Sequence, residues 1–69
     1  MNYRDYISAD YRVMLGKPVL TGTRLSVELI LRKLAEGATF DDLTRMYPDL
    51  PTGSIQAILQ YAADLVENE

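Results

Sequence analysis

Few residues of this chain could take part in catalysis. It contains no histidine and no cysteine, which excludes Ser-His and Cys-His nucleophiles and the usual zinc sites. Asp41 and Asp42 form the one adjacent carboxylate pair that could suggest a magnesium site. Neighbouring residues on a helix diverge by about 100°, so the two carboxylates cannot easily address one ion, and a helix start explains them better. We therefore expect no metal, no cofactor and no enzymatic activity.

A second kind of chemistry is contact with nucleic acid. Basic side chains could reach phosphates, and glutamines on the polar side of the last predicted helix could hydrogen-bond adenine edges. These candidate DNA-binding residues are Lys17, Arg24, Arg32, Lys33, Arg45, Gln56 and Gln60. The last predicted helix has no lysine or arginine, which weakens it as a DNA-reading helix. Solvation of an exposed polar face is the competing interpretation of the two glutamines.

Contact with another protein is the third possibility. Tyr3, Tyr6 and Tyr11 fall within the first eleven residues, and tyrosine offers a large contact area at interfaces. Packing over the helices is the alternative for these side chains. Leu29 points about 200° away from Val27 on the first predicted helix, so we expect it to be exposed and available to a partner.

The length of the chain, 69 residues, leaves room for one domain. A domain of this size buries only about 60% of the surface of its unfolded chain, and its core rarely supplies more than about 3 to 5 kcal/mol. Without cysteine no disulfide can add to this. We therefore expect a partner chain, with a homodimer as the first candidate.

Charge is distributed unevenly within the net value of −3. Residues 1–25 carry four basic and two acidic side chains, whereas residues 26–69 carry three basic and eight acidic ones. Contact with nucleic acid should therefore use the front of the chain. No apolar run approaches the roughly 18 to 20 residues that a membrane span needs, so we expect no membrane association. The lack of cysteine fits a reducing compartment, and we expect a cytoplasmic protein.

Hydrophobic periodicity predicts three helices in the C-terminal two thirds, at residues 27–36, 40–46 and 53–67. Their predicted N-caps are Ser26, Thr39 and Thr52. Gly37 is suited to the left-handed end of the first helix, and Pro48 ends the second. The last helix should turn one apolar stripe to the core, consisting of Ile55, Ile58, Leu59, Ala62, Leu65 and Val66.

The front of the chain alternates short apolar stretches with turn residues. This alternation runs through residues 13–25, and the segment is interpreted as two short strands or extended arms. A two-stranded ribbon is marginal alone in water, so it must lie on the helices or pair with another chain. The predicted fold class is mainly α, a three-helix homeodomain-like or helix-turn-helix cluster with a short N-terminal β arm or ribbon. We expect one domain, with the arm at residues 1–26 and the three helices at 27–69.

Four separated runs are similar to a widespread bacterial family catalogued as domain of unknown function 433. These runs are GKPVLTGTRLSV from Gly16, EGATF from Glu36, YPDL from Tyr47 and IQAILQYA from Ile55. The resemblance covers nearly the whole chain and has two departures: Tyr11 stands where a proline is usual, and Leu15 where a glycine is common. It implies a helix-turn-helix protein of the VapB antitoxin type, encoded beside a PIN-like ribonuclease toxin.

By that resemblance, the protein would neutralise its cognate toxin by direct contact and bind its operator DNA. The alternative is a protein-protein interaction module or adaptor without DNA binding, which gains its order from a partner. Such a module would use the arm and exposed apolar residues, with Tyr3, Tyr6, Tyr11 and Leu29 as the candidate contacts.

Overall fold

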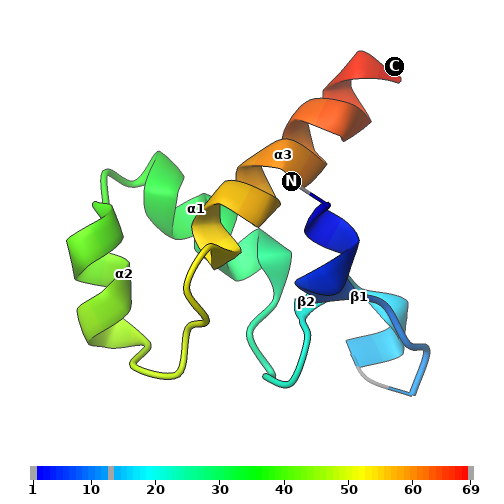
Figure 1. The fold of residues 1–69 in the computed structure, drawn as a ribbon, viewed down its shortest axis with the longest axis horizontal. Coiled ribbons are helices and arrows are strands. Elements are labelled where there is room, and N and C mark those ends of the chain that lie inside the picture. Colours follow the sequence, from blue (N-terminus) through cyan, green and yellow to red (C-terminus); the bar gives the residue numbers. More distant parts are fainter. Residues whose placement is uncertain (1, 13, 69) are drawn as a thin grey trace.

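The computed structural model of the chain describes residues 2–12 and 14–68. In chain order it has a 3-10 turn η1 (Tyr3–Asp5), strand β1 (Ile7–Ser8), a second 3-10 turn η2 (Met14–Gly16), strand β2 (Val19–Leu20) and three helices, α1 (Val27–Ala35), α2 (Phe40–Met46) and α3 (Ser54–Glu67). The mainly α fold with a short N-terminal β ribbon is thereby confirmed. Figure 1 shows η1 lying beside α3, with α2 on the far side of the molecule. Among the described residues, none of the helices is long and apolar enough for a membrane crossing.

The first two helices begin and end where the sequence predicts, to within one residue. The Ser26 hydroxyl oxygen accepts a hydrogen bond from the Leu29 backbone N–H at 3.0 Å. At the start of α2, the Asp42 N–H donates to Thr39 Oγ1 at 3.1 Å, and the Thr39 N–H donates to Asp42 Oδ2 at 2.9 Å. This reciprocal box satisfies two N–H groups that a helix start leaves without partners. Beyond α1, Gly37 has the predicted left-handed backbone, with φ of +102°.

The predicted cap of α3 is wrong. Gly53, and not Thr52, is the N-cap of α3, and it makes no side-chain capping bond. The Ser54 N–H donates to the Pro51 carbonyl at 3.1 Å, which closes a turn in which Gly53 has a φ of +87°. A Cβ atom on Gly53 would lie 3.1 Å from the Tyr6 hydroxyl. Helix α3 therefore starts one residue later than predicted, after a turn in which Gly53 lies against Tyr6.

In the front segment, the predicted ribbon of two short strands is confirmed, and its first strand lies earlier in the chain than the apolar stretches that predicted it. Strand β2 pairs antiparallel with β1, with Ile7 opposite Leu20. Residue 13 lies outside the described residues, and Met14–Gly16 form the turn η2. Leu15 has φ of +57° there, which is incompatible with an extended strand. The Gly16 N–H donates to the Asp10 carbonyl at 3.2 Å and closes the loop between the strands.

The core joins the β ribbon to all three helices. Four large apolar side chains of the core are 0% exposed: Leu20 from β2, Ile30 from α1, Leu43 from α2 and Ile58 from α3. Two further backbone bonds hold the ribbon on the helices, from the Val27 N–H to the Pro18 carbonyl at 3.0 Å and from the Leu20 N–H to the Leu25 carbonyl at 2.9 Å. The front segment therefore lies on the helices, which is one of the two arrangements that the marginal stability of a lone ribbon allows.

The core stripe predicted for α3 is only half covered. Ile55 and Ile58 are buried, but Leu59, Leu65 and Val66 are 44%, 56% and 66% exposed. Leu65 and Val66 lie in the last turns of α3, which project beyond the rest of the molecule (Figure 1), whereas Leu59 directly follows the buried Ile58.

A second side of α3, which the sequence analysis did not assign to the core, is covered instead. Ala57 is buried, and on the helix it lies between Gly53 and Tyr61. Tyr6 packs against Gly53, and Tyr3 packs against Tyr61. The N-terminal segment therefore buries this side of α3.

Candidate protein-binding surfaces

The predicted DNA-binding residues are dispersed over the molecule, and most basic ones are held by an acid of the same chain. Lys17 and Arg32 come together, because both pair with Glu28, at 3.3 and 3.0 Å. The other two pairs lie further along the chain, Lys33 with Glu36 at 3.9 Å and Arg45 with Asp42 at 2.6 Å. Arg24 is exposed in the turn before α1. Pairing of this kind reduces the positive charge that each side chain offers to a phosphate.

The exposed polar side of α3 is neutral or acidic along its length. Gln56 is exposed, and Gln60 donates from Nε2 to Asp64 Oδ1 at 3.0 Å. Asp64 and Glu67 are the charged residues of this helix, and both repel a phosphate backbone. The glutamines and the basic residues therefore do not form one phosphate-binding face.

Two of the four predicted partner-contact residues are used within the fold. The rings of Tyr3 and Tyr61 meet edge to face, with centroids 5.5 Å apart, and the Arg4 guanidinium lies 5.8 Å from the centre of the Tyr3 ring. Tyr6 is half-buried against Gly53. The expectation that tyrosines pack over the helices is confirmed for these two.

The other two candidates differ in exposure. Leu29, which we expected to be exposed, is half-buried. A leucine on a helix leans back over the preceding turn, which lowers its exposure. Tyr11, by contrast, is 77% exposed.

Among the described residues of the front segment, Tyr11 and Leu15 are large apolar side chains that are exposed, and together we name them the arm tip. Leu15 is 76% exposed, close to the value for Tyr11. The backbone next to Tyr11 is fastened, because Asp10 accepts hydrogen bonds from the Arg12 N–H at 2.9 Å and from Arg12 Nε at 3.2 Å. The Arg12 guanidinium, followed by its backbone N–H, lowers the pKa of Asp10, so the carboxylate that holds this turn stays ionised near neutral pH.

Leu15 is held in a conformation that leucine rarely adopts. Its φ of +57° and ψ of 35° lie in the left-handed region, which costs a residue with a Cβ atom roughly 1 to 2 kcal/mol. Its exposed side chain recovers little of that cost by burial within the chain. Strain of this kind persists where the surrounding structure imposes it, and such residues concentrate at functional sites.

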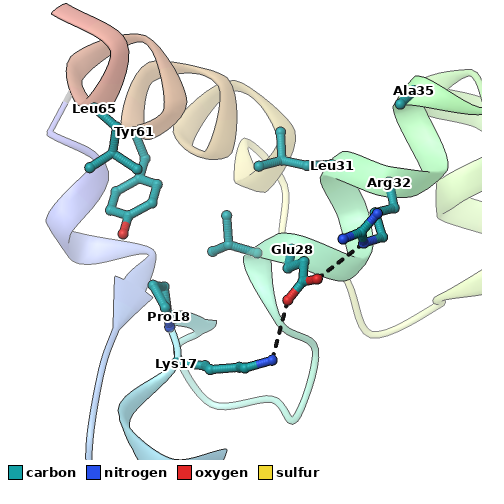
Figure 2. A pocket seen from close by; sticks show the side chains of 9 residues that line it. Lys17, Pro18, Glu28, Leu31, Arg32, Ala35, Tyr61 and Leu65 are labelled. Atoms are coloured by element: carbon teal, nitrogen blue, oxygen red, sulfur yellow. Dashed lines mark hydrogen bonds and ion pairs between the residues drawn. The ribbon is translucent and has the colours of Figure 1, made fainter. Parts of the chain in front are cut away.

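A second apolar surface is a groove between α1 and α3, with a volume of about 520 Å³. Figure 2 shows Leu31 on α1 facing Tyr61 and Leu65 on α3, with Pro18 at one end. We name this surface the α1–α3 groove; the residues that line it are Lys17, Pro18, Val27, Glu28, Leu31, Arg32, Ala35, Tyr61 and Leu65. This groove is not among the surfaces predicted from the sequence. The signal for it was the spacing of four that puts Val27, Leu31 and Ala35 on one side of α1.

Charge lies along one edge of this groove. Figure 2 shows Glu28 between Lys17 and Arg32, with a bond to each. The hydrogen bond from Arg32, followed by that from Lys17, lowers the pKa of Glu28, so its carboxylate is ionised at neutral pH. Two cations share one anion, which leaves this edge with one net positive charge.

Comparison with known proteins identifies a family. The family model described as "Protein of unknown function (DUF433)" matches residues 7–62, which is more than half of the chain. No curated protein matches the chain, and no solved structure does.

Proposed function

The chain belongs to the DUF433 family of proteins of unknown function, and we propose that it is an antitoxin-like protein that binds and neutralises a PIN-like ribonuclease toxin by direct contact. The observation that carries the proposal is the arm tip. Tyr11 and Leu15 are 77% and 76% exposed, and tyrosine is enriched among the residues that anchor protein interfaces.

The strain at Leu15 adds a second argument. A leucine with φ of +57° destabilises the isolated chain, and its exposed side chain contributes little to the core. Contact with a partner would bury this side chain and so offset part of the cost of the strain. The polar groups of Asp10 and Arg12 bond to one another, so the turn presents Tyr11 without an unpaired carboxylate beside it.

Operator binding has no comparable support, and the proposal is confined to the protein partner. The helix that would enter the major groove, α3, has two acidic residues and no basic one. The remaining basic candidates are dispersed, and four of them are paired with carboxylates. These features favour the interaction module over a DNA-reading protein.

The test measures the affinity for the toxin encoded beside this gene, by titration calorimetry and by inhibition of its ribonuclease activity. Leu15→Gly removes the side chain and relieves the left-handed strain. We expect it to raise the stability of the isolated protein by about 0.5 to 1 kcal/mol and yet to weaken binding about tenfold or more. Tyr11→Ala should weaken binding to a similar degree.

Leu59→Ala is the matched control, because Leu59 is also an exposed leucine but lies on α3, away from the arm tip. We expect it to leave the affinity unchanged. Equal affinity of the wild type, Leu15→Gly and Tyr11→Ala would reject the arm tip as the contact, and no binding by the wild-type protein would reject the antitoxin proposal itself.

A gel-shift titration with the DNA upstream of the gene tests whether the protein binds operator DNA. At micromolar protein and low salt we expect no sequence-specific shift by this protein alone. A shift that survives addition of competitor DNA would restore operator binding as a function of the chain.

A further inference from the structure

The apolar stripe of α3 continues past the part of the molecule that covers it. Leu65 is seven residues after Ile58, which is two helical turns, so the two side chains point in nearly the same direction. Ile58 is 0% exposed and Leu65 is 56% exposed. The difference arises from what lies against each side chain, because the last turns of α3 extend beyond the other elements (Figure 1).

This uncovered stretch is continuous with the α1–α3 groove, since Leu65 and Tyr61 form one of its walls (Figure 2). We propose that a second copy of this chain covers the groove. The two copies are related by a twofold axis, and each places Leu65 of its projecting α3 turns against the groove of the other. The proposal does not depend on the antitoxin function, because it uses a different surface.

Charge argues for a second copy as the occupant. The end of α3 carries acids and no base, although the C-terminus of a helix favours positive charge. On the helix, Asp64 lies about 100° from Leu65 and so flanks the groove wall, whereas Glu67 lies about 200° away and faces elsewhere. The groove edge has one net positive charge from Lys17, Arg32 and Glu28. A twofold pair brings Asp64 of each copy towards the positive edge of the other.

Core size agrees with a partner chain as the occupant. Among the described residues, eight hydrophobic side chains are buried. So small a core rarely sustains a domain of this length without a crosslink, a metal or a partner.

The first experiment measures the dimer dissociation constant of the full chain by sedimentation equilibrium. We expect a monomer–dimer equilibrium for the wild type. Leu65→Asp should raise the dissociation constant about tenfold or more, because it places a charge in the apolar contact.

The matched control for this variant is Val66→Asp. Val66 is 66% exposed and does not line the groove, and it lies about 100° from Leu65 on the same turn. It should have a markedly smaller effect. Both positions are exposed, so circular dichroism should show that both variants keep the fold.

A series of charge reversals tests the orientation of the two copies in the proposed dimer, in which Asp64 of one copy lies near the positive groove edge of the other. Asp64→Lys and Arg32→Glu should each weaken the dimer several-fold, and the two together should recover most of the loss, because they restore opposite charges across the interface. Glu67→Lys makes the same change of charge on the same helix but away from the groove, and it should leave the dissociation constant unchanged.

A wild-type protein that stays monomeric at hundreds of micromolar would overturn the proposal, as would equal losses for Leu65→Asp and Val66→Asp. Weaker binding of the toxin by Leu65→Asp, with every variant monomeric, would assign the groove to the toxin instead and would likewise reject the second copy.

Discussion

The two halves of α3 have the same amphipathic pattern and opposite surroundings. In the first half, Ser54, Ile55, Ala57 and Ile58 are buried. In the second half, Leu65 and Val66 are 56% and 66% exposed. Periodicity therefore shows which side of a helix is apolar, whereas coverage of that side depends on where the other elements end. The part of the apolar stripe that lies beyond the fold is the surface on which we propose that a second copy docks.

The largest expected difference is between alanine variants at Ile58 and Leu65, whose side chains point in nearly the same direction on α3. Ile58→Ala should lower the free energy of unfolding by about 2 to 5 kcal/mol, because it opens a cavity in the core. Leu65→Ala should change it by less than about 0.5 kcal/mol at protein concentrations where the chain is monomeric. Urea denaturation at low micromolar concentration measures both. Similar losses would show that the end of α3 is packed in the monomer.

A substitution at Gly53 tests whether contact with Tyr6 constrains the N-terminus of α3. Gly53→Ala should destabilise the protein by more than the roughly 1 to 2 kcal/mol that a left-handed alanine costs, because the new Cβ would lie 3.1 Å from the Tyr6 hydroxyl. Gly22→Ala is the control, since Gly22 has φ of +82° and nothing within 4 Å of an added Cβ. Thermal unfolding of the two variants gives the difference. If both lose the same amount, Tyr6 does not constrain the start of α3.

Two serines at helix starts should respond in opposite directions. Ser54 Oγ is buried, and within the described residues it has no hydrogen-bond partner, so Ser54→Ala should raise the stability by up to about 1 kcal/mol. Ser26→Ala should lower it by about 1 kcal/mol, because Ser26 Oγ caps α1 by accepting from the Leu29 N–H. Chemical denaturation compares the pair. A loss at Ser54 would mean that its hydroxyl has a partner in solution.

The smallest expected effect is a dependence of helix stability on pH, which we expect for α2 but not for the start of α3. The backbone N–H of Thr39, and then the Thr39 side chain, lowers the folded-state pKa of Asp42 below its ordinary value of 3.8. The ionised form of Asp42 therefore stabilises the fold above about pH 3.8, and this contribution is lost as the pH falls through the lower folded-state value. The start of α3 has no acid in its first turn.

Residue-specific hydrogen exchange on acidification should therefore show earlier opening of α2 than of α3. Asp42→Asn should remove the pH dependence of α2 itself. Equal opening of the two helices in the wild-type protein would contradict this assignment.

The backbone at Leu15 has φ of +57°. Glycine adopts that conformation without strain, whereas leucine does not. The turn at the arm tip therefore lowers the stability of the isolated chain.

The sequence alone determined the elements whose ends are set by neighbouring residues. Ser26 and Thr39 cap α1 and α2 through bonds that span three residues, and Pro48 ends α2 because it restricts the residue before it. These interactions are complete within a few positions of the chain, so their residue types are sufficient to predict them. The same holds for strand β2, whose short apolar run lies between turn residues.

Only the tertiary structure decided the features that join distant segments. The pairing of Ile7 with Leu20, the start of α3 against Tyr6 and the walls of the α1–α3 groove each bring together residues far apart in the sequence. The sequence predicted the apolar side of α3 but not that Leu65 lies beyond the cover of the fold. Burial is a property of what surrounds a side chain, and a helix pattern carries no information about where the neighbouring elements stop.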